Sequence, residues 1–132
     1  MPLRPQMILP LNCTNVLLAD FEVAESPPMW ALHLAYCKNV IVRRLRINAA
    51  DGPNNDGIIV DSCKNVVVED CDLHVHDDCI ALKSGLNEDG RRVGKPTENV
   101  IVRRVRATAG HGGITIGSDG LFSGTIWVPS NA

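Results

Sequence analysis

A dipeptide repeat constrains the fold of this 132-residue chain more than any other feature of its sequence. An Asn-Val pair recurs at Asn15, Asn39, Asn65 and Asn99, at intervals of 24, 26 and 34 residues. Self-similarity on this scale is the signature of repeat proteins, in which each unit packs mainly on its neighbours. The longest interval contains the polar stretch "LNEDGRRVGKPTE", which we interpret as an inserted surface loop.

The segments around these pairs have the composition of β-strands. Apolar runs such as "GIIVDSC", "CIALKSG" and "GITIGSD" occur between the turn signals, and the 3.6-residue period of a helix is absent. Aromatic residues make up only 4% of the chain, so its apolar content comes from Val, Ile, Leu and Ala. We predict an all-β fold, a right-handed single-stranded parallel β-helix of about five coils, incomplete at both ends. Its coils would occupy residues 1–119, and residues 120–132 would form a divergent C-terminal tail.

Two other repetitive or all-β folds fit the sequence less well. A leucine-rich repeat needs a regular leucine spacing and a helical segment, and both are missing from the sequence. A β-sandwich needs hairpin turns such as Asn-Gly between the apolar runs, and no such turn separates these runs. The parallel β-helix is therefore the better interpretation.

Two residue types in the repeat suit stacked coils. Equivalent asparagines would lie above one another at the strand spacing of about 4.8 Å, where their amides can bond to one another in a ladder. A cysteine stands two residues before three of them, at Cys13, Cys37 and Cys63. That position suits a small apolar residue facing inward. Buried free thiols are the favoured interpretation, and bridging of successive cysteines is the alternative.

The charge and hydropathy patterns exclude several kinds of partner. The formal net charge is −2, and no apolar run approaches the roughly 18 residues of a transmembrane helix, so we expect neither a nucleic-acid partner nor membrane insertion. The first residues, "MPLRPQMILPLNC", lack the organisation of a signal peptide. Either the protein is not exported or this chain begins inside a larger one. We expect a monomer.

Acidic residues stand directly before the apolar runs at intervals of one coil. Asp56 precedes "GIIVDSC" and Asp78 precedes "CIALKSG", 22 residues later. Aligning the runs also puts His111 in register with Asp77. Three carboxylates and one imidazole would then meet on one face of the helix. Crowded carboxylates repel one another, so at least one pKa should rise, which is the condition that a general acid requires.

Each of these motifs also has a purely structural interpretation. An aspartate before a β-run is often a turn residue, and the "GHGG" segment at Gly110 to Gly113 is often a flexible bend. A calcium site is a third option, because clustered carboxylates bind Ca²⁺, although the register supplies few further ligands. The registry of the motifs on adjacent coils favours a catalytic site over the structural interpretation.

Three of the segments resemble, in order and spacing, the signature blocks of the polygalacturonase (pectinase) family of glycoside hydrolases. They are "NNDG" at Asn54 to Gly57, "DDCIALKSG" at Asp77 to Gly85 and "GHGGITIGS" at Gly110 to Ser118. The resemblance spans roughly residues 3 to 119. It implies a parallel β-helix that hydrolyses α-1,4-galacturonan with inversion of the anomeric configuration.

The resemblance also implies roles for individual residues. Asp77 would be the general acid, Asp56 and Asp78 would activate the attacking water, and His111 would support the acid and contact the sugar. Asn54, Lys83, Gly110 and Gly112 would contribute to substrate binding, with a salt bridge to an aspartate as an equal alternative for Lys83. The substrate would be the acidic polysaccharide pectin, no cofactor or metal would be needed, and the protein would be secreted or periplasmic.

The sequence departs from the family pattern at several points. Asn55 and His76 stand where threonine and glycine are usual, and the Arg-Ile-Lys block expected about one coil after "GHGG" is missing. We interpret the chain as a truncated member of the family. The alternatives are a catalytically inactive β-helix remnant and a related hydrolase that acts on rhamnogalacturonan or xylogalacturonan. Trp30, at the start of "WALHLAYC", would be a core residue or a stacking lid.

Overall fold

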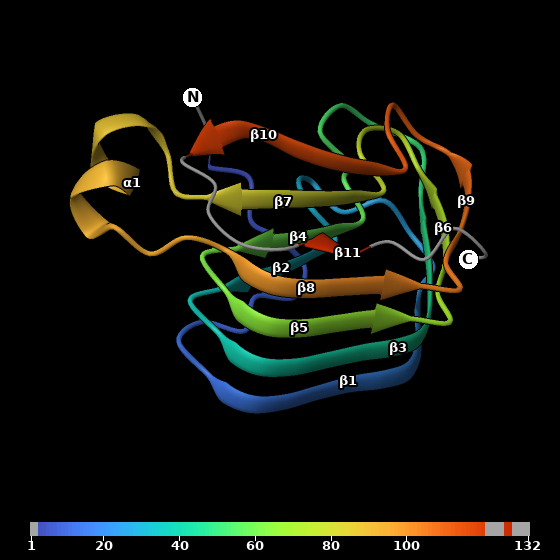
Figure 1. Ribbon diagram of the computed structural model, residues 1–132. Coiled ribbons are helices and arrows are strands. Elements are labelled where there is room, and N and C mark those ends of the chain that lie inside the picture. The colour runs from blue at the N-terminus through green and yellow to red at the C-terminus, as the bar shows by residue number, and fades with distance from the viewer. Residues whose placement is uncertain (1–2, 121–125, 128–132) are drawn as a thin grey trace.

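The computed structural model describes residues 3–120 and 126–127, and it confirms the right-handed parallel β-helix (Figure 1). Its strands are β1 (Thr14–Val23), β2 (Leu32–Ala35), β3 (Lys38–Ala49), β4 (Ile58–Asp61), β5 (Lys64–Glu69), β6 (Asp72–Val75), β7 (Ile80–Ser84), β8 (Glu98–Arg103), β9 (Arg106–Ala109), β10 (Ile114–Gly120) and β11 (Ile126–Trp127). Every pairing between these strands is parallel. Successive coils therefore stack in chain order, as the repeat predicts.

The coils contribute to two sheets. A four-stranded sheet has the order β10-β7-β4-β2, and a seven-stranded sheet has the order β11-β8-β5-β3-β6-β9, with β1 also paired to β3. The long strand β3 bends, because residues 38–43 pair with β5 and residues 46–49 pair with β6. The seven-stranded sheet thus supplies two flanks of the helix and the four-stranded sheet supplies the third (Figure 1).

The predicted asparagine ladder is present at the turn that enters the seven-stranded sheet. Asn39, Asn65 and Asn99 each donate a side-chain hydrogen bond to the preceding asparagine, at 3.1, 3.0 and 3.1 Å. The four ladder asparagines have φ between 56° and 59°, in the left-handed region that asparagine tolerates better than most residues. One side chain therefore serves both the tight turn and the stacking of coils.

A second row of left-handed residues marks the bend within the seven-stranded sheet. Asp20, Arg44, Asp70 and Arg104 occupy this row, with φ between 51° and 63°. Arg44 donates two hydrogen bonds to Asp20, and Arg104 donates two to Asp70. The charges in the row alternate from coil to coil, so each arginine lies next to an acid.

The core is a continuous stack of Val, Ile, Leu and Ala from all coils. Cys37 and Cys63 are 2% and 0% exposed, which confirms their predicted inward orientation. Cys13 is exposed, because it belongs to the outermost described coil, where no further coil covers it. All five cysteines, which lie within the described residues, are free thiols.

The polar insertion differs from the predicted loop, because it contains the short helix α1 (Asn87–Val93). None of the residues of α1 is buried, so the sequence of this helix shows no apolar residues at a helical spacing. Acidic residues in its first turn, basic residues in its last turn and the left-handed Gly94 after it (φ 64°) stabilise the helix ends. Among the described helices, none has the length and hydropathy to cross a lipid bilayer.

The predicted tail, residues 120–132, lies mostly outside the described residues. Its described residues are Gly120, which ends β10, and β11, which pairs with β8 at Val100 and Ile101. The backbone therefore returns to the seven-stranded sheet one coil after β8, although the sequence there has no Asn-Val pair.

Candidate active site

The predicted registry of the acidic residues is confirmed at the start of the four-stranded sheet. Ile58 pairs with Ile80, and Ile80 pairs with Ile114, so Asp56 and Asp78 occupy equivalent positions on adjacent coils. The N–H of Asp77 donates to the carbonyl of Asn55, and the N–H of His111 donates to the carbonyl of Asp77. Backbone hydrogen bonds between coils therefore fix the chain on both sides of the acids.

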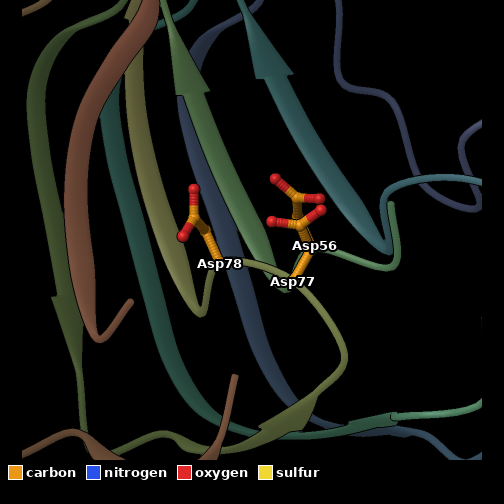
Figure 2. A group of neighbouring side chains, drawn as sticks. All are labelled: Asp56, Asp77 and Asp78. Atoms are coloured by element: carbon orange, nitrogen blue, oxygen red, sulfur yellow. The ribbon is translucent and has the colours of Figure 1, made fainter. Parts of the chain in front are cut away.

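The three carboxylates lie close together (Figure 2). One oxygen from each of Asp56, Asp77 and Asp78 lies within 4.8 Å of the corresponding oxygens of the other two. The carboxylates of Asp56 and Asp77 lie next to each other, and that of Asp78 approaches from the side (Figure 2). Asp56 is 5% exposed, whereas the Asp77 side chain is 25% exposed. The cluster thus has one buried member and two that are partly exposed.

Burial and repulsion change the acidity of the cluster. Desolvation, followed by the charges of Asp77 and Asp78, raises the pKa of Asp56 to about 7, although the nearby Lys83 opposes the rise. The expectation that at least one carboxyl has a raised pKa therefore holds. The shift falls on Asp56, which is the buried member, whereas the resemblance assigns the acid role to Asp77.

His111 lies beside the cluster on the surface. Its Nδ1 is 3.4 Å from Oδ1 of Asp77, and its side chain is 70% exposed. The His76 ring is 5.8 Å from the His111 ring, centroid to centroid, so His76 packs at the outer edge. The unusual His76 therefore lies beside His111 and does not line the pocket described next.

A pocket of about 520 Å³ opens over the acids. It is lined by Met29, Trp30, Asn54, Asp56, Asp77, Asp78, Lys83, Thr115, Ile116 and Gly117. Lys83 is the cation in this lining. It is 7% exposed, and its Nζ donates to the carbonyl of Gly117 at 3.3 Å and lies 5.3 Å from the centre of the Trp30 ring. In this pocket a ligand that carries negative charge would be attracted by Lys83 and repelled by any ionised acid.

The two asparagines of the "NNDG" segment have different positions. Asn54 lines the pocket and accepts a hydrogen bond from Nη2 of Arg4 at 2.9 Å. Asn55 is 1% exposed, and its amide donates to the carbonyls of Pro27 and Met29 on the preceding coil. Asn55 therefore anchors the loop that carries Asp56.

The glycines of the "GHGG" segment make room for the acids. A Cβ on Gly110 would lie 2.7 Å from the carbonyl oxygen of Asp77, and φ at Gly110 is 142°. A Cβ on Gly112 would lie 3.0 Å from the carboxylate of Asp78 and closer still to the side chain of Thr115. Neither glycine lines the pocket. Because neither position has a side chain, the segment before β10 can pack closely against Asp77 and Asp78.

The pocket also contains residues that the sequence did not mark as functional. Trp30, Met29, Thr115 and Ile116 line it together with the predicted residues. Counting back from the paired Leu32 and Ile58 places Trp30 in register with Asp56. Extending the alignment one coil upstream would therefore have identified Trp30 as a site residue.

The acid cluster is also the one group of three or more potential metal ligands among the described residues. Ca²⁺ takes six to eight oxygen ligands, and the cluster contributes three carboxylates. Lys83 adds a positive charge within the same pocket. The arrangement is better suited to holding a proton than to completing a calcium site.

The chain is similar to known proteins over nearly its whole length. The model of glycosyl hydrolases family 28 matches residues 2–126. A probable polygalacturonase of Vitis vinifera is 34% identical over 88% of this chain and 24% of its own length, and one of Arabidopsis thaliana is 37% identical over 95% and 25%.

Solved structures agree with this match. The crystal structure of a hyperthermoactive exopolygalacturonase from Thermotoga maritima has a TM-score of 0.89 at 39% identity, over 96% of this chain and 29% of that protein. A family 28 exopolygalacturonase of Yersinia enterocolitica has a TM-score of 0.75 at 29% identity, over 80% of this chain and 18% of that one. The chain spans about a quarter of the length of the curated relatives it matches. Because the family model covers more than nine-tenths of the residues, this chain belongs to glycosyl hydrolases family 28.

Proposed function

We propose that this chain carries the reacting face of a pectin-degrading polygalacturonase, which hydrolyses the α-1,4 links of galacturonan. The observation that supports the proposal best is the convergence of Asp56, Asp77 and Asp78 within 4.8 Å from adjacent coils. The polygalacturonases among its relatives support the substrate class. The proposal includes export of the protein, since pectin is extracellular.

In the proposed reaction, the carboxyl of Asp77 protonates the glycosidic oxygen and a water molecule attacks the anomeric carbon from the opposite face. Asp56 and Asp78 hold and deprotonate that water, and His111 supports Asp77 from outside. The ammonium of Lys83 pairs with the carboxylate of a galacturonate unit, with Asn54 at the rim of the pocket. No cofactor or metal takes part. The product would have the inverted anomeric configuration.

The proton for this reaction belongs to the cluster as a whole. Charged Asp77 and Asp78 both raise the pKa of Asp56, so protonation of any one of the three relieves the repulsion between the others. A proton on Asp56 in the free protein and a proton on Asp77 in the complex are two states of one coupled site. Transfer between them would leave Asp56 ionised and ready to activate water.

The distance between the acids makes the stereochemistry a decisive measurement. The carboxyl groups of inverting glycosidases are usually about 6.5–9.5 Å apart, which leaves room for water, and those of retaining enzymes are about 5–5.5 Å apart. The closest oxygens here lie within 4.8 Å. Proton NMR of the first product should show the β-anomer, and an α-anomer would contradict the inverting mechanism.

The direct test is release of reducing sugar from polygalacturonate by the chain and by Asp77→Asn. Loss of a general acid should lower the turnover number by about 10²- to 10⁴-fold. Asp89→Asn, an exposed change in α1, is the matched control and should keep full activity. Equal activity in Asp77→Asn and the parent would remove Asp77 from the acid role.

The assigned roles also predict a pH dependence. Because Asp77 donates the proton that the cluster loses near pH 7, activity should fall as the pH increases through about 7, the pKa of Asp56. An activity that instead rises through the same range would mean that Asp56 must be ionised in the free protein and that Asp77 takes its proton from elsewhere. The pH profile of kcat/KM for the parent chain distinguishes the two assignments.

A catalytically inactive β-helix is the second candidate for these 132 residues taken alone, which span about a quarter of the length of the relatives. Turnover of polygalacturonate by the 132-residue chain would exclude it. A third candidate within the enzyme class is a hydrolase of rhamnogalacturonan or xylogalacturonan. Product analysis on several pectins would separate these substrates.

A further inference from the structure

A buried histidine behind the pocket has no role in the reaction proposed above. The side chain of His33 is 12% exposed, and neither of its ring nitrogens has a hydrogen-bond partner among the described residues. Its closest polar contact joins Nε2 to Oδ2 of Asp61 at 3.5 Å. Buried polar atoms are normally hydrogen-bonded, so a histidine in this state calls for an explanation.

Asp61 holds the polar edge of this histidine. The N–H of Gly85 and the hydroxyl of Ser62 both donate to Oδ1 of Asp61, at 2.9 and 3.0 Å, which leaves Oδ2 facing His33. Burial raises the pKa of Asp61, but the contacts with His33, Gly85 and Ser62 lower it more, so the carboxylate is ionised. The carboxylate thus faces the Nε2 edge of the imidazole.

The histidine also contacts an aromatic residue of the pocket. The rings of His33 and Trp30 meet edge to face, with centroids 4.9 Å apart and an interplanar angle of 88°. The ammonium of Lys83 lies 5.3 Å from the centre of the Trp30 ring, within the range of a cation–π interaction. The contacts therefore run without a gap from Asp61 through His33 and Trp30 to Lys83.

We propose that His33 is a positioning residue, which holds the Trp30 ring against the Lys83 ammonium and so fixes this cation beside the three carboxylates. The inference deepens the proposed function, on which its catalytic consequence rests. The acid cluster and the carboxylate of an acidic sugar both attract the Lys83 ammonium. The position of its ammonium decides how strongly it attracts each of them.

The charge of Lys83 provides a readout that does not depend on turnover. Lys83 lowers the pKa of Asp56, against burial and the neighbouring acids. An ammonium that moves away from the cluster must therefore let that pKa rise. Carbon NMR of the aspartate carboxyl groups over a pH series measures the Asp56 pKa directly in the full 132-residue chain.

The experiment compares the parent with Lys83→Met, His33→Leu and the double variant. Removal of a close opposite charge should raise the Asp56 pKa by about 1 or more, and His33→Leu should raise it in the same direction by a smaller amount. In the Lys83→Met background, His33→Leu should add nothing, because the cation through which it acts is gone. His33→Phe keeps an aromatic edge against Trp30 and should return the pKa toward the parent value.

Two further variants keep the test decisive. His74→Phe, an exposed histidine on β6, is the matched control and should leave the Asp56 pKa unchanged. If His33→Leu does not fold, Trp30→Leu breaks the same chain of contacts one step later and should also raise the pKa. A pKa that stays constant in the His33 and Trp30 variants overturns the proposal. A rise that persists in the Lys83→Met background also overturns it, because His33 would then act on Asp56 by another route.

Turnover separates this inference from the proposed function. On polygalacturonate, His33→Leu should raise KM more than it lowers kcat, because the displaced cation weakens the hold on the substrate carboxylate. An inactive parent chain would refute the proposed function for this chain, and the Asp56 titration would still decide the role of His33. If the Asp56 pKa in His33→Leu equals that of the parent, and the parent turns over polygalacturonate, only the positioning role is refuted.

Discussion

The outer faces of the two sheets come from the same repeat, but one carries stacked amides and the other carries stacked carboxylates. At the edge of the seven-stranded sheet, four asparagines stack above one another and satisfy each other's hydrogen bonds. At the start of the four-stranded sheet, Asp56 and Asp78 stack in the same way and repel. An amide both donates and accepts, whereas a carboxylate only accepts. Stacking of identical residues therefore stabilises the first face and destabilises the second.

Each face also has a groove, and their linings differ. The groove along the asparagine ladder has a volume of about 570 Å³ and is lined by asparagine and apolar side chains, among them Leu17 and Ile41. Among the residues that the structure describes, no titratable side chain lines it. The pocket on the four-stranded sheet holds three acids and a lysine. The concentration of charge identifies the reactive face better than the size of the groove does.

The largest expected effect on stability is a gain from removing the buried charge. Asp56→Asn imitates the protonated carboxyl, so at pH 8 the variant should be more stable than the parent by up to about 4 kcal/mol. The pKa of Asp56 lies above its ordinary value in the folded chain, so its favourable contribution is complete below about pH 4 and is lost as the pH rises to about 7.

Urea unfolding at several pH values checks this prediction. The free energy of unfolding of the parent should fall between about pH 4 and 7, and the curve of Asp56→Asn should lack that fall. Asp89→Asn, on the exposed helix α1, should follow the parent. Identical curves for Asp56→Asn and the parent would show that Asp56 is not strained in the folded state.

A smaller effect, in the opposite direction, is expected in the asparagine ladder. Asn39→Ala removes one hydrogen bond to Asn15 and one from Asn65, and it places alanine at a φ of 58°. Two exposed hydrogen bonds and one strained φ should together cost about 2 kcal/mol. Asn39→Gly tolerates the turn and should cost less, so the difference between the two variants isolates the strain.

Chemical denaturation of these variants, together with Asn15→Ala, completes the comparison. Asn15 stands at the end of the described ladder and has one ladder partner, so its loss should cost less than the loss of Asn39. Equal losses at Asn15 and Asn39 would mean that the turn conformation, and not the ladder, provides the stability.

The smallest effect is expected in the apolar groove. Ile41 is 40% exposed, and Ile41→Thr keeps a β-branched side chain in the strand, so the free energy of unfolding should change by no more than about 0.5 kcal/mol. Turnover should be unchanged, since this face lies on the other sheet. A loss of activity in Ile41→Thr would show that the two faces are coupled.

Much of the fold was predictable because strand register follows from a short repeat. Once the apolar runs are aligned, Asp56, Asp78 and Gly112 take equivalent positions on successive coils, as the pairing of the strands confirms. The helix α1 was missed because its signals are charges and a terminal glycine, and no buried face imposes an apolar period. Cys13 was misjudged because exposure at an outer coil depends on what covers it.

The details of the site depend on how deeply each side chain is buried and on where it points, and the sequence specifies neither. The repeat predicts that the acids meet, but it does not show that Asp56 is the buried member and has the raised pKa. The contact of Trp30 with His33 and Lys83 joins residues from different coils through the orientation of their rings. Only the register of Trp30, one coil upstream of Asp56, was available from the sequence.

The alternating acids and bases at the bend of the long strands distinguish odd coils from even ones. Asp20 and Asp70 belong to alternate coils, and Arg44 and Arg104 belong to the coils between and after them. A misfolded chain that skipped one coil would bring Asp20 against Asp70, whereas asparagine would meet asparagine in either arrangement. The charges therefore favour the stacking of the coils in chain order. Four identical amides provide no such preference.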